Sequence, residues 1–324
     1  MVANLSADDI KQTVLALPEI AAWPEIAALF LKAQANEAVR LDWQLPALAS
    51  RAVGGAEAVA LPAVGAIACL QISIILVDDM LDQDPRGTYH RLGVGPTANV
   101  ALAFQAAALN LIGRAAAPPA ARAAAAAALS AAALATAFGQ ELDVQNLRGE
   151  EDYWRVVRAK STPFYGAALQ TGALLGGAEL PLAQGLYDFG VVLGEMIQIF
   201  DDLVDAFEAP ANPDWGEGRN NLAILYARTA DHPGRAEFLR MVADTGDPRV
   251  LHEAQKFLIS SGAVSYCMYQ QLQRHRIGRA ILDRLELADS APMSELLRNQ
   301  VDPLTRWLQD IGAAVPEEIA RMIA

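Results

Sequence analysis

The sequence predicts an all-α protein, and three observations carry this prediction. Hydrophobic residues make up 53 % of the 324 residues, whereas aromatic residues make up only 6 %. Much of the apolar content is alanine and leucine, which favour helices, and β-branched stretches are few. No stretch alternates apolar and polar residues for long enough to indicate a strand. We expect one helical domain over residues 1–324, with apolar residues in plenty for a large core.

Short polar or glycine- and proline-containing breaks separate the expected helices. They fall at 84–87, at Pro118-Pro119 and at Gly176-Gly177, and the longest covers 209–218. Each segment between two breaks is rich in helix-forming residues, and Ala7-Asp8-Asp9 indicates a capped first helix. The expected helices cover residues 8–17, 24–52, 57–82, 96–114, 119–148, 151–175, 181–208, 219–229, 235–244, 247–260, 263–287 and 292–322.

The net charge of −13 excludes some classes of partner. An acidic chain repels nucleic acid and anionic membrane surfaces, but it favours divalent cations where carboxylates converge. The alanine-rich run at 124–139 is too short and too weakly apolar to predict a membrane span. The N-terminal stretch lacks the basic and apolar regions of a signal peptide, so none is expected. Cys69 and Cys267 are isolated, which predicts buried thiols in a cytoplasmic protein.

Two acidic motifs each follow a long apolar run. "DDMLD" at 78–82 ends the run AIACLQISIILV, and "DDLVD" at 201–205 ends GVVLGEMIQIF. On a helix, the first and last carboxylates of each motif point the same way, with the second carboxylate beside them. Like charges about 4 Å apart repel by several kcal/mol at an effective dielectric constant near 20, so a cation should hold them. The expected metal ligands are Asp78, Asp79, Asp82, Asp201, Asp202 and Asp205.

Magnesium suits these carboxylates. It prefers oxygen, keeps several waters, and is commonly held by one or two carboxylates together with substrate phosphates. Two such helices facing each other predict a site that grips a diphosphate through shared Mg²⁺ ions. Cationic side chains would complete it by binding phosphate oxygens, and Arg86, Lys160 and Arg219 are the candidates.

With these residues in view, the chain resembles the trans-isoprenyl diphosphate synthases, the polyprenyl synthetase family, over nearly its whole length. Several segments match in order, and the second acidic motif keeps the preceding glutamine, Gln198. Departures within the motifs are Ser161 at a threonine position, Ile197 at a phenylalanine position and Arg219 at a lysine position. The matching segments are "DDMLDQDPRG", "GQELD" (139–143), "RAKSTPFYGAALQTGALLGG", "GEMIQIFDDLVD", "DWGEGRNNLAILYA" and "SGAVSYCMYQQL".

The resemblance implies an isoprenoid-synthase helical bundle around a deep central cavity, usually as a homodimer. It implies three Mg²⁺ ions bound by Asp78, Asp82 and Asp201, with the other three aspartates in supporting roles. It also implies that Arg86, Lys160 and Arg219 hold an allylic diphosphate. The metals and cations would stabilise the departing diphosphate and leave an allylic carbocation. Isopentenyl diphosphate would then attack, while the dipoles of Gln198, Ser161 and Thr162 steady the cation.

The isopentenyl half of the site departs from the family. Its usual Gly-Gly-Lys segment, which binds isopentenyl diphosphate, is replaced, and matching by distance puts Val39 at the lysine position and Asp42 at the arginine position. An aspartate there would repel a diphosphate. Only one arginine, Arg86, follows the first motif, although Gln71 matches a family position in the same pocket.

Three functional interpretations stay open. The first is elongation of a prenyl diphosphate with a remodelled second site. The second is a class I terpene synthase that ionises one prenyl diphosphate and closes or quenches the cation. The third is a subunit of a heteromeric synthase, against which the intact aspartates argue. A purely structural, metal-free helical protein is the least favoured alternative.

The hydrocarbon tail should lie along the helix that leads into Asp78. In the family, the residues four and five positions before the first motif form the floor of the pocket, and here these are Ile74 and Ser73. Neither is aromatic, and Leu70 and Ile67 lie deeper. The small floor predicts room for a farnesyl or geranylgeranyl chain, although the same residues also suit plain packing against a neighbouring helix.

Overall fold

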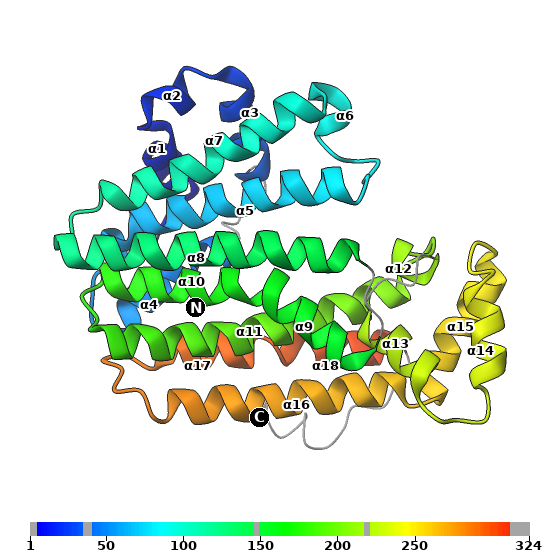
Figure 1. Cartoon of the computed structure of the whole chain (residues 1–324). Coiled ribbons are helices and arrows are strands. Elements are labelled where there is room, and N and C mark those ends of the chain that lie inside the picture. Colours follow the sequence, from blue (N-terminus) through cyan, green and yellow to red (C-terminus); the bar gives the residue numbers. More distant parts are fainter. Residues whose placement is uncertain (1–4, 35–40, 146–148, 217–220, 312–324) are drawn as a thin grey trace. The chain divides into compact units, whose positions relative to one another are not determined.

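The computed structural model describes residues 5–34, 41–145, 149–216 and 221–311 (Figure 1). Within these ranges the chain forms helices and no strand, which confirms the all-α prediction. The contacts divide the chain into two compact units. Unit 1 comprises Met1–Phe138, Thr162–Val191 and Ile281–Glu295, and unit 2 comprises Gly139–Ser161, Val192–Ala280 and Leu296–Ala324. The expectation of a single domain stays a prediction.

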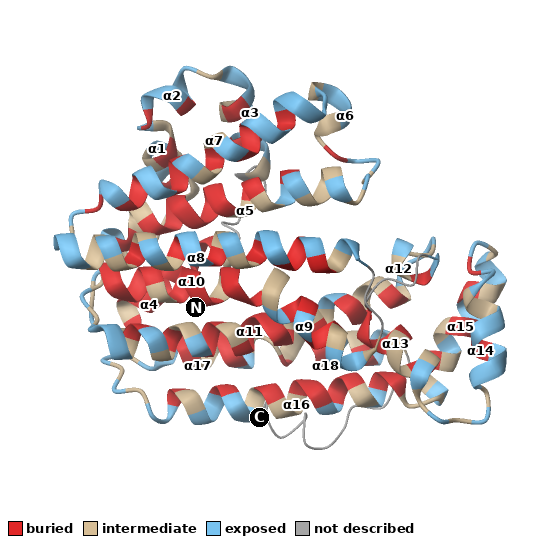
Figure 2. Cartoon of the chain, viewed as in Figure 1, coloured by how far each residue is buried: buried red, intermediate tan, exposed pale blue. Residues whose placement is uncertain are grey.

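Helix α5, Leu61–Leu81, is the core helix of unit 1. It packs against α1 (Ala7–Leu15), α4 (Leu41–Ala52), α7 (Val94–Gly113) and α10 (Thr162–Leu175). Its N-terminal two thirds are buried on nearly all sides, as Figure 2 shows, whereas its last turns are partly exposed. A helix that is apolar all round belongs in a core. The burial therefore follows from the sequence, and the partly exposed C-terminal end carries the first acidic motif.

Glycines allow α4 and α10 to approach closely. A Cβ atom on Gly172 would lie 2.1 Å from the carbonyl oxygen of Pro46, and one on Gly176 would lie 2.7 Å from Oγ of Ser50. Gly172 and Gly176 are four residues apart, so both face α4 from one side of α10 and its C-terminal end. The contact explains why the polypeptide has glycine, and no larger residue, at these two positions.

Unit 2 is built on α9 (Glu150–Lys160), the second half of α11 (Leu180–Phe207) and most of α16 (Ala263–Leu282). Helix α13, Leu222–Thr229, packs against α9, and it also packs against the two helices that follow it. The remaining elements of the two units are η1 Glu57–Ala60, α2 Pro18–Ala21, α3 Pro24–Gln34, α6 Tyr89–Leu92, α8 Pro119–Val144, α12 Pro213–Gly216, α14 Arg235–Val242, α15 Pro248–Ser260, α17 Ala291–Arg298 and α18 Asp302–Asp310.

Two long expected helices are broken. The helix expected over 151–175 ends at Lys160 and begins again at Thr162, and the one expected over 292–322 is interrupted before Asp302. Each new helix has proline as its second residue, Pro163 and Pro303. Proline lacks an N–H and restricts the residue before it, so it favours the first turn of a helix over its interior. The short helices α2, α6 and α12 were not predicted, and residues 35–40 within the expected 24–52 helix lie outside the described residues.

Two helical stretches have the length and composition of a membrane span, Glu57–Leu81 and Pro119–Val144. The alanine-rich run at 124–139 is short by itself, but the helix that contains it has 26 residues and meets both criteria. The most apolar window of the first stretch is 67 % buried, as in a core helix, whereas that of α8 is 22 % buried. Length and apolarity of one or two helices are weak evidence for a membrane, but α8 does expose an apolar surface.

Adding one methyl group at Gly172 tests the α4–α10 contact. We expect Gly172→Ala to lower the free energy of unfolding by about 1–3 kcal/mol, because the methyl group meets a backbone carbonyl. Urea unfolding measures the change. Gly113→Ala on α7 is the control, since a Cβ atom there meets nothing within 4 Å, and it should be neutral or slightly stabilising. Equal stability of the two variants would contradict the close approach.

Candidate functional site

The second acidic motif separates into two accessible carboxylates and one buried carboxylate. Asp201 is exposed and Asp205 is partly exposed, and both lie on α11 four residues apart. Asp202 is only 3 % exposed. Asp201 and Asp205 are therefore accessible at a spacing of four residues, and their role as metal ligands stays a prediction, whereas Asp202 is buried within unit 2.

Asp202 is held by donors from three directions. Its Oδ2 accepts from the hydroxyl of Tyr153 at 2.7 Å and from the backbone N–H of Leu222 at 2.8 Å. Its Oδ1 accepts from Nε2 of Gln198 at 2.9 Å. Burial raises the pKa of the Asp202 carboxyl to about 7, and these hydrogen bonds oppose the shift. The carboxylate thus joins α9, α11 and the start of α13.

Asn221 reinforces the same junction. Its Nδ2 donates to the backbone carbonyl of Asp202 at 2.6 Å and to Oδ2 of Asp214 at 3.1 Å. Its side-chain oxygen accepts from the N–H of Ile224, so it caps α13. The buried indole of Trp215 donates to the carbonyl of Ala206 at 3.2 Å. Both flanks of segment 217–220 are therefore anchored to α11, while Arg219 itself lies outside the described residues.

Lys160 and Ser161 stand at the C-terminal end of α9. Nζ of Lys160 donates to Oδ2 of Asp143 at 2.7 Å, and Oγ of Ser161 donates to Oε1 of Gln198 at 2.8 Å. A Cβ atom on Gly139 would lie 2.2 Å from the backbone nitrogen of Lys160, so only glycine lets α8 pass this close. The "GQELD" segment thus supplies both the close approach and the carboxylate that holds Lys160.

The first motif closes α5 in unit 1. Asp78, Asp79 and Asp82 are all partly exposed, and Asp82 caps the helix. Gln83 adopts a left-handed conformation with φ 54°, and the N–H of Asp84 donates to the carbonyl of Asp79 at 3.0 Å. Burial raises the pKa of Asp79, and the charges of Asp84 and Asp78 raise it further. Repulsion among these carboxylates is the condition that a bound cation relieves.

Arg86, predicted to bind diphosphate, is paired with Asp84 in a fork. Its Nε lies 3.1 Å from Oδ1 and its Nη2 lies 2.8 Å from Oδ2 of that carboxylate. These contacts hold the pKa of Asp84 below its usual value. The guanidinium is 89 % exposed, so the pair is a weak surface interaction that a substrate phosphate can replace.

Gln71, the other predicted diphosphate ligand in unit 1, has both ends of its amide engaged. Its Oε1 accepts from Nε1 of Trp43 at 2.7 Å, and its Nε2 donates to Oδ2 of Asp42 at 3.0 Å. Trp43 is buried and stacks on Phe30 with ring centroids 5.9 Å apart. A rigid indole thus fixes the amide, and the nearest charge is negative. Val39 lies outside the described residues.

The predicted tail residues lie on α5 in unit 1. Ser73 is buried and Ile74 is partly exposed. Leu70, one turn deeper, lies at the floor of an apolar cavity of about 440 Å³ that opens between α7 and α8. Its walls carry Leu102 and Leu109 of α7 and Leu134 of α8. The cavity is lined almost entirely by aliphatic side chains, so it suits hydrocarbon.

The described residues contain no group of three or more histidine, cysteine or acidic side chains arranged to hold a metal ion. The donor set nevertheless fits magnesium, because each motif presents a pair of carboxylates four residues apart on a fixed helix. Mg²⁺ needs only one or two protein carboxylates and completes its shell with water and phosphate oxygens. The number of ions and their ligands stay predictions.

Three residues with contacts in this site escaped the sequence prediction: Tyr153, Asp143 and Asn221. Tyr153 acts on Asp202 through the fold, and no local pattern marks it. Asp143 and Asn221 each belong to a segment quoted above, "GQELD" and "DWGEGRNNLAILYA", which is the available signal for them. Thr162, predicted beside Ser161, is buried at the start of α10 in unit 1.

Comparisons with known proteins bear on this geometry. The model of a family described as polyprenyl synthetase matches residues 44–258. The chain is 28 % identical over 266 residues to a short chain isoprenyl diphosphate synthase of Methanothermobacter thermautotrophicus, covering 76 % of this chain and 80 % of that protein.

Solved structures agree on the fold. A geranylgeranyl pyrophosphate synthetase from Pyrococcus horikoshii matches with a TM-score of 0.78 at 20 % identity, over 91 % of this chain and 94 % of that one. A polyprenyl synthase from Caulobacter crescentus, complexed with calcium and isoprenyl diphosphate, matches with a TM-score of 0.72 at 21 % identity, over 90 % and 96 %. These likenesses confirm the predicted fold class.

Removing the hydroxyl of Tyr153 tests the burial of Asp202. We expect Tyr153→Phe to lower the free energy of unfolding by about 1–3 kcal/mol, because a buried carboxyl loses one of its donors. Tyr269→Phe is the control, since that tyrosine is 53 % exposed. Urea unfolding compares the two variants, and a loss no larger than the control's would contradict the anchoring role.

Proposed function

The chain belongs to the polyprenyl synthetase family, and from this premise we propose that it is a Mg²⁺-dependent trans-prenyltransferase. Its donor substrate is an allylic prenyl diphosphate and its acceptor is isopentenyl diphosphate. The relative in Methanothermobacter is named for this class of reaction, and the Caulobacter structure contains a divalent cation with isoprenyl diphosphate. Both facts support the assignment of substrate class and cofactor.

One observation carries the proposal: the second motif leaves Asp201 and Asp205 accessible while it fixes its own helix through Asp202. Metal ligands must be held rigidly but must stay open to substrate. The buried carboxylate supplies the rigidity, because it is bonded to two other segments of unit 2. Asp201 and Asp205 stay accessible on the same helix and can therefore face a metal–diphosphate complex.

The chain's own side chains have separate tasks in this reaction. We assign Asp78, Asp82 and Asp201 to three Mg²⁺ ions, with Asp79 and Asp205 near them and Asp202 as the internal anchor. When bound, these ions neutralise the departing diphosphate and lower the energy of ionisation. Arg86, Lys160 and Arg219 bind phosphate oxygens of the allylic substrate directly. To bind phosphate, Lys160 leaves its partner Asp143. The free energy this costs is limited, because Asp143 is partly exposed and water can solvate its carboxylate.

Bond changes follow from this arrangement. The C1–O bond of the allylic substrate breaks and its electron pair leaves with diphosphate. The double bond of isopentenyl diphosphate then forms the new C–C bond, and one proton passes to the released diphosphate. Gln198 accepts from Ser161 and donates to Asp202, so its amide orientation is fixed with the oxygen end toward Ser161. The oxygens of Gln198 and Ser161 lower the energy of the intermediate cation by their dipoles.

Among the described residues, nothing favours a terpene synthase or a heteromeric subunit over elongation. The small floor at Ser73 and Ile74 supports an allylic substrate of the farnesyl or geranylgeranyl class. The aliphatic cavity that Leu70 lines also suits an apolar tail, since its volume of about 440 Å³ lies in the range of ligand pockets, roughly 300–1,000 Å³.

We also propose that the enzyme is a homodimer formed through α7 and α8. Six large apolar side chains are exposed on these two helices, and three of them, Leu102, Leu109 and Leu134, line the cavity. An exposed apolar surface of this kind marks an interaction site, and a second copy of the chain buries both surfaces symmetrically. The other three exposed side chains are Val94, Phe138 and Val144.

The two cysteines support a cytoplasmic location. Cys69 and Cys267 are both buried and free. Burial raises the pKa of the Cys69 thiol to about 12 and that of Cys267 well above its usual value, so neither is reactive. Free thiols without a disulfide fit a reducing compartment.

Product analysis tests the function. The purified protein is incubated with Mg²⁺ and geranyl, farnesyl or geranylgeranyl diphosphate, each with and without isopentenyl diphosphate. We expect longer prenyl diphosphates only with isopentenyl diphosphate, and no turnover in excess EDTA. Asp201→Asn should lower kcat by on the order of 100-fold or more, because the leaving group loses charge stabilisation. The exposed Asp231→Asn is the matched control and should change nothing.

Two outcomes contradict this assignment. Hydrocarbon or alcohol released from one diphosphate alone identifies a terpene synthase. An Asp201→Asn rate equal to that of the control removes the metal site at the second motif.

One charge on α8 tests the dimer. We expect Leu134→Glu to raise the dimer dissociation constant by on the order of 100-fold, because an unpaired carboxylate would be buried in the interface. Light scattering after gel filtration measures the oligomeric state. Leu180→Glu is the control, since Leu180 is 61 % exposed against 74 % for Leu134 and lies outside the cavity. A monomeric wild-type protein, or a dimer unaffected by Leu134→Glu, would refute the interface.

A further inference from the structure

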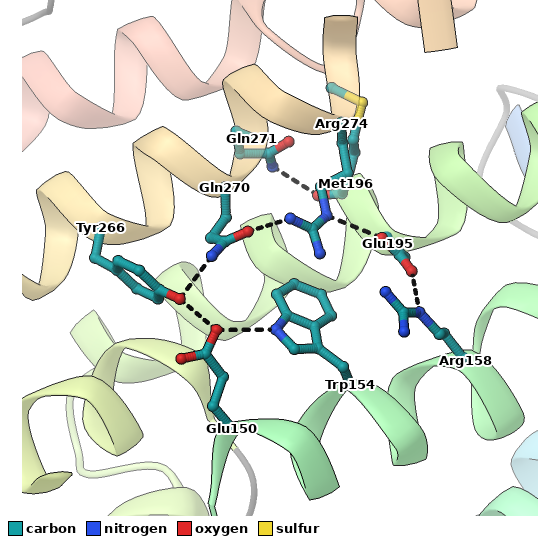
Figure 3. A network of polar contacts seen from close by, with 9 residues as sticks. All are labelled: Glu150, Trp154, Arg158, Glu195, Met196, Tyr266, Gln270, Gln271 and Arg274. Atoms are coloured by element: carbon teal, nitrogen blue, oxygen red, sulfur yellow. Dashed lines mark hydrogen bonds and ion pairs between the residues drawn. The ribbon is translucent and has the colours of Figure 1, made fainter. Parts of the chain in front are cut away.

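Glu195 is a buried carboxylate shared by two arginines. It is 7 % exposed and lies on α11, one turn before Gln198. Its Oε1 accepts from Nε of Arg158 on α9 at 2.7 Å, and its Oε2 accepts from Nε of Arg274 on α16 at 2.9 Å (Figure 3). The carboxylate therefore joins three helices of unit 2, and no substrate role has been assigned to it.

A second set of contacts links Arg274 to α9. The guanidinium of Arg274 lies 3.9 Å above the ring of Trp154, and its Nη1 donates to Oε1 of Gln270. Gln270 donates to the hydroxyl of Tyr266, which donates to Glu150 at the start of α9. Nε1 of Trp154 donates to the same carboxylate at 3.2 Å. As Figure 3 shows, Glu150 joins the start of α9 to Tyr266 of α16, and Arg158 near the end of α9 is bonded to Glu195 of α11.

The charges of this network balance. It contains two carboxylates and two guanidiniums: Glu195 contacts both Arg158 and Arg274, and Glu150 is linked to Arg274 through Tyr266 and Gln270. Buried ion pairs are seldom more stabilising than apolar residues of the same shape, because desolvation offsets the attraction. Their directional bonds do restrict the helices to one relative position. The buried Glu195–Arg274 pair and the partly exposed Glu195–Arg158 pair therefore contribute to the geometry of the three helices more than to stability.

The fixed geometry includes the site residues at the end of α9. Three hydrogen bonds join this helix and its cap to α11: Tyr153 to Asp202, Arg158 to Glu195 and Ser161 to Gln198, at 2.7, 2.7 and 2.8 Å. Arg158 lies between the other two contacts in sequence, and Lys160 follows it by two residues. Apart from the bond of Ser161 itself, the ion pair is therefore the contact between α9 and α11 that lies nearest in sequence to Lys160 and Ser161.

We propose that Glu195 is a positioning residue, which acts through Arg158 to keep Ser161 on Gln198 and Lys160 in place at the end of α9. This inference rests on the proposed function of Lys160, Ser161 and Gln198. Neither Glu195 nor Arg158 touches substrate. Loss of the ion pair lets the last turn of α9 shift, so that the Ser161–Gln198 dipoles no longer face the reacting carbon.

The test removes Arg158, because its side chain is 58 % exposed and Glu195 keeps Arg274 as a partner. Glu195→Gln is the weaker choice, since it leaves Arg274 buried without its carboxylate and can unfold the protein. Full-length Arg158→Met, Ser161→Ala and the double variant are compared by kcat at saturating allylic and isopentenyl diphosphates. Arg155→Met is the matched control, since Arg155 is an exposed arginine on the same helix.

We expect Arg158→Met to lower kcat about tenfold, because a small displacement of catalytic groups is costly in rate. Arg158→Lys should recover part of the loss, and Arg155→Met should stay within about twofold of wild type. In the Ser161→Ala background, Arg158→Met should lower kcat by no more than about twofold further, because both changes act through one contact. If Arg158 had a merely structural role, the two changes would act independently, and the fold-losses in kcat of the single variants would multiply in the double variant.

Two outcomes would overturn the positioning role and leave the prenyltransferase assignment intact. One is a double variant whose loss in kcat is the product of the two single losses, and the other is an equal kcat for Arg158→Met and Arg155→Met. A wild-type protein that turns over no prenyl diphosphate would overturn both.

Discussion

The burial of Asp202 is the constraint on which the rest of unit 2 depends. A carboxylate removed from water must be satisfied by donors, and here Tyr153, Gln198 and the N–H of Leu222 supply them. Each donor belongs to a different part of the chain, so satisfying one carboxylate aligns α9, α11 and α13. The same aspartate lies between Asp201 and Asp205 on the helix, which turns their side chains outward. The same motif therefore fixes α11 through Asp202 and leaves Asp201 and Asp205 accessible to solvent.

The Glu195 network repeats this principle seven residues earlier on α11. Two buried carboxylates, spaced by two helical turns, each recruit a side chain from α9. An apolar interface would tolerate small rotations of α9, because dispersion contacts depend only weakly on direction. Hydrogen bonds to charged groups depend strongly on direction and resist such rotations. Ser161 ends α9 and bonds to Gln198. Its position is therefore set by polar contacts on both sides of it along α11, and this is the precision that a dipole acting on a transient cation requires.

The sequence predicted what repeats along a helix and missed what converges from separate segments. Apolar runs predicted α5 and α11, and spacing of four predicted that Asp201 and Asp205 share a side. The same spacing gave no sign that Asp202 is buried, because its burial depends on Tyr153 and Leu222, which are distant in sequence. The break at Ser161 did not follow from the helical pattern of 151–175, because the one local sign of it is Pro163 in the first turn of α10. The sequence marks Gly139 as part of the "GQELD" motif. It does not show the close approach to the backbone of Lys160 that requires a glycine there.

The polar cluster of Gln71, Asp42 and Trp43 in unit 1 is not arranged to bind an anion. Amide ligands of an anion must present N–H groups, yet Nε2 of Gln71 is directed to Asp42 and its oxygen to the indole of Trp43. Turning the amide would place its NH₂ against the indole N–H and its oxygen against a carboxylate, so both contacts would be lost. The stacked Trp43–Phe30 pair prevents the indole from following. An acceptor diphosphate at this position would therefore meet a fixed amide and a negative charge, so its phosphate oxygens must be recognised by cationic groups other than those the family pattern places there.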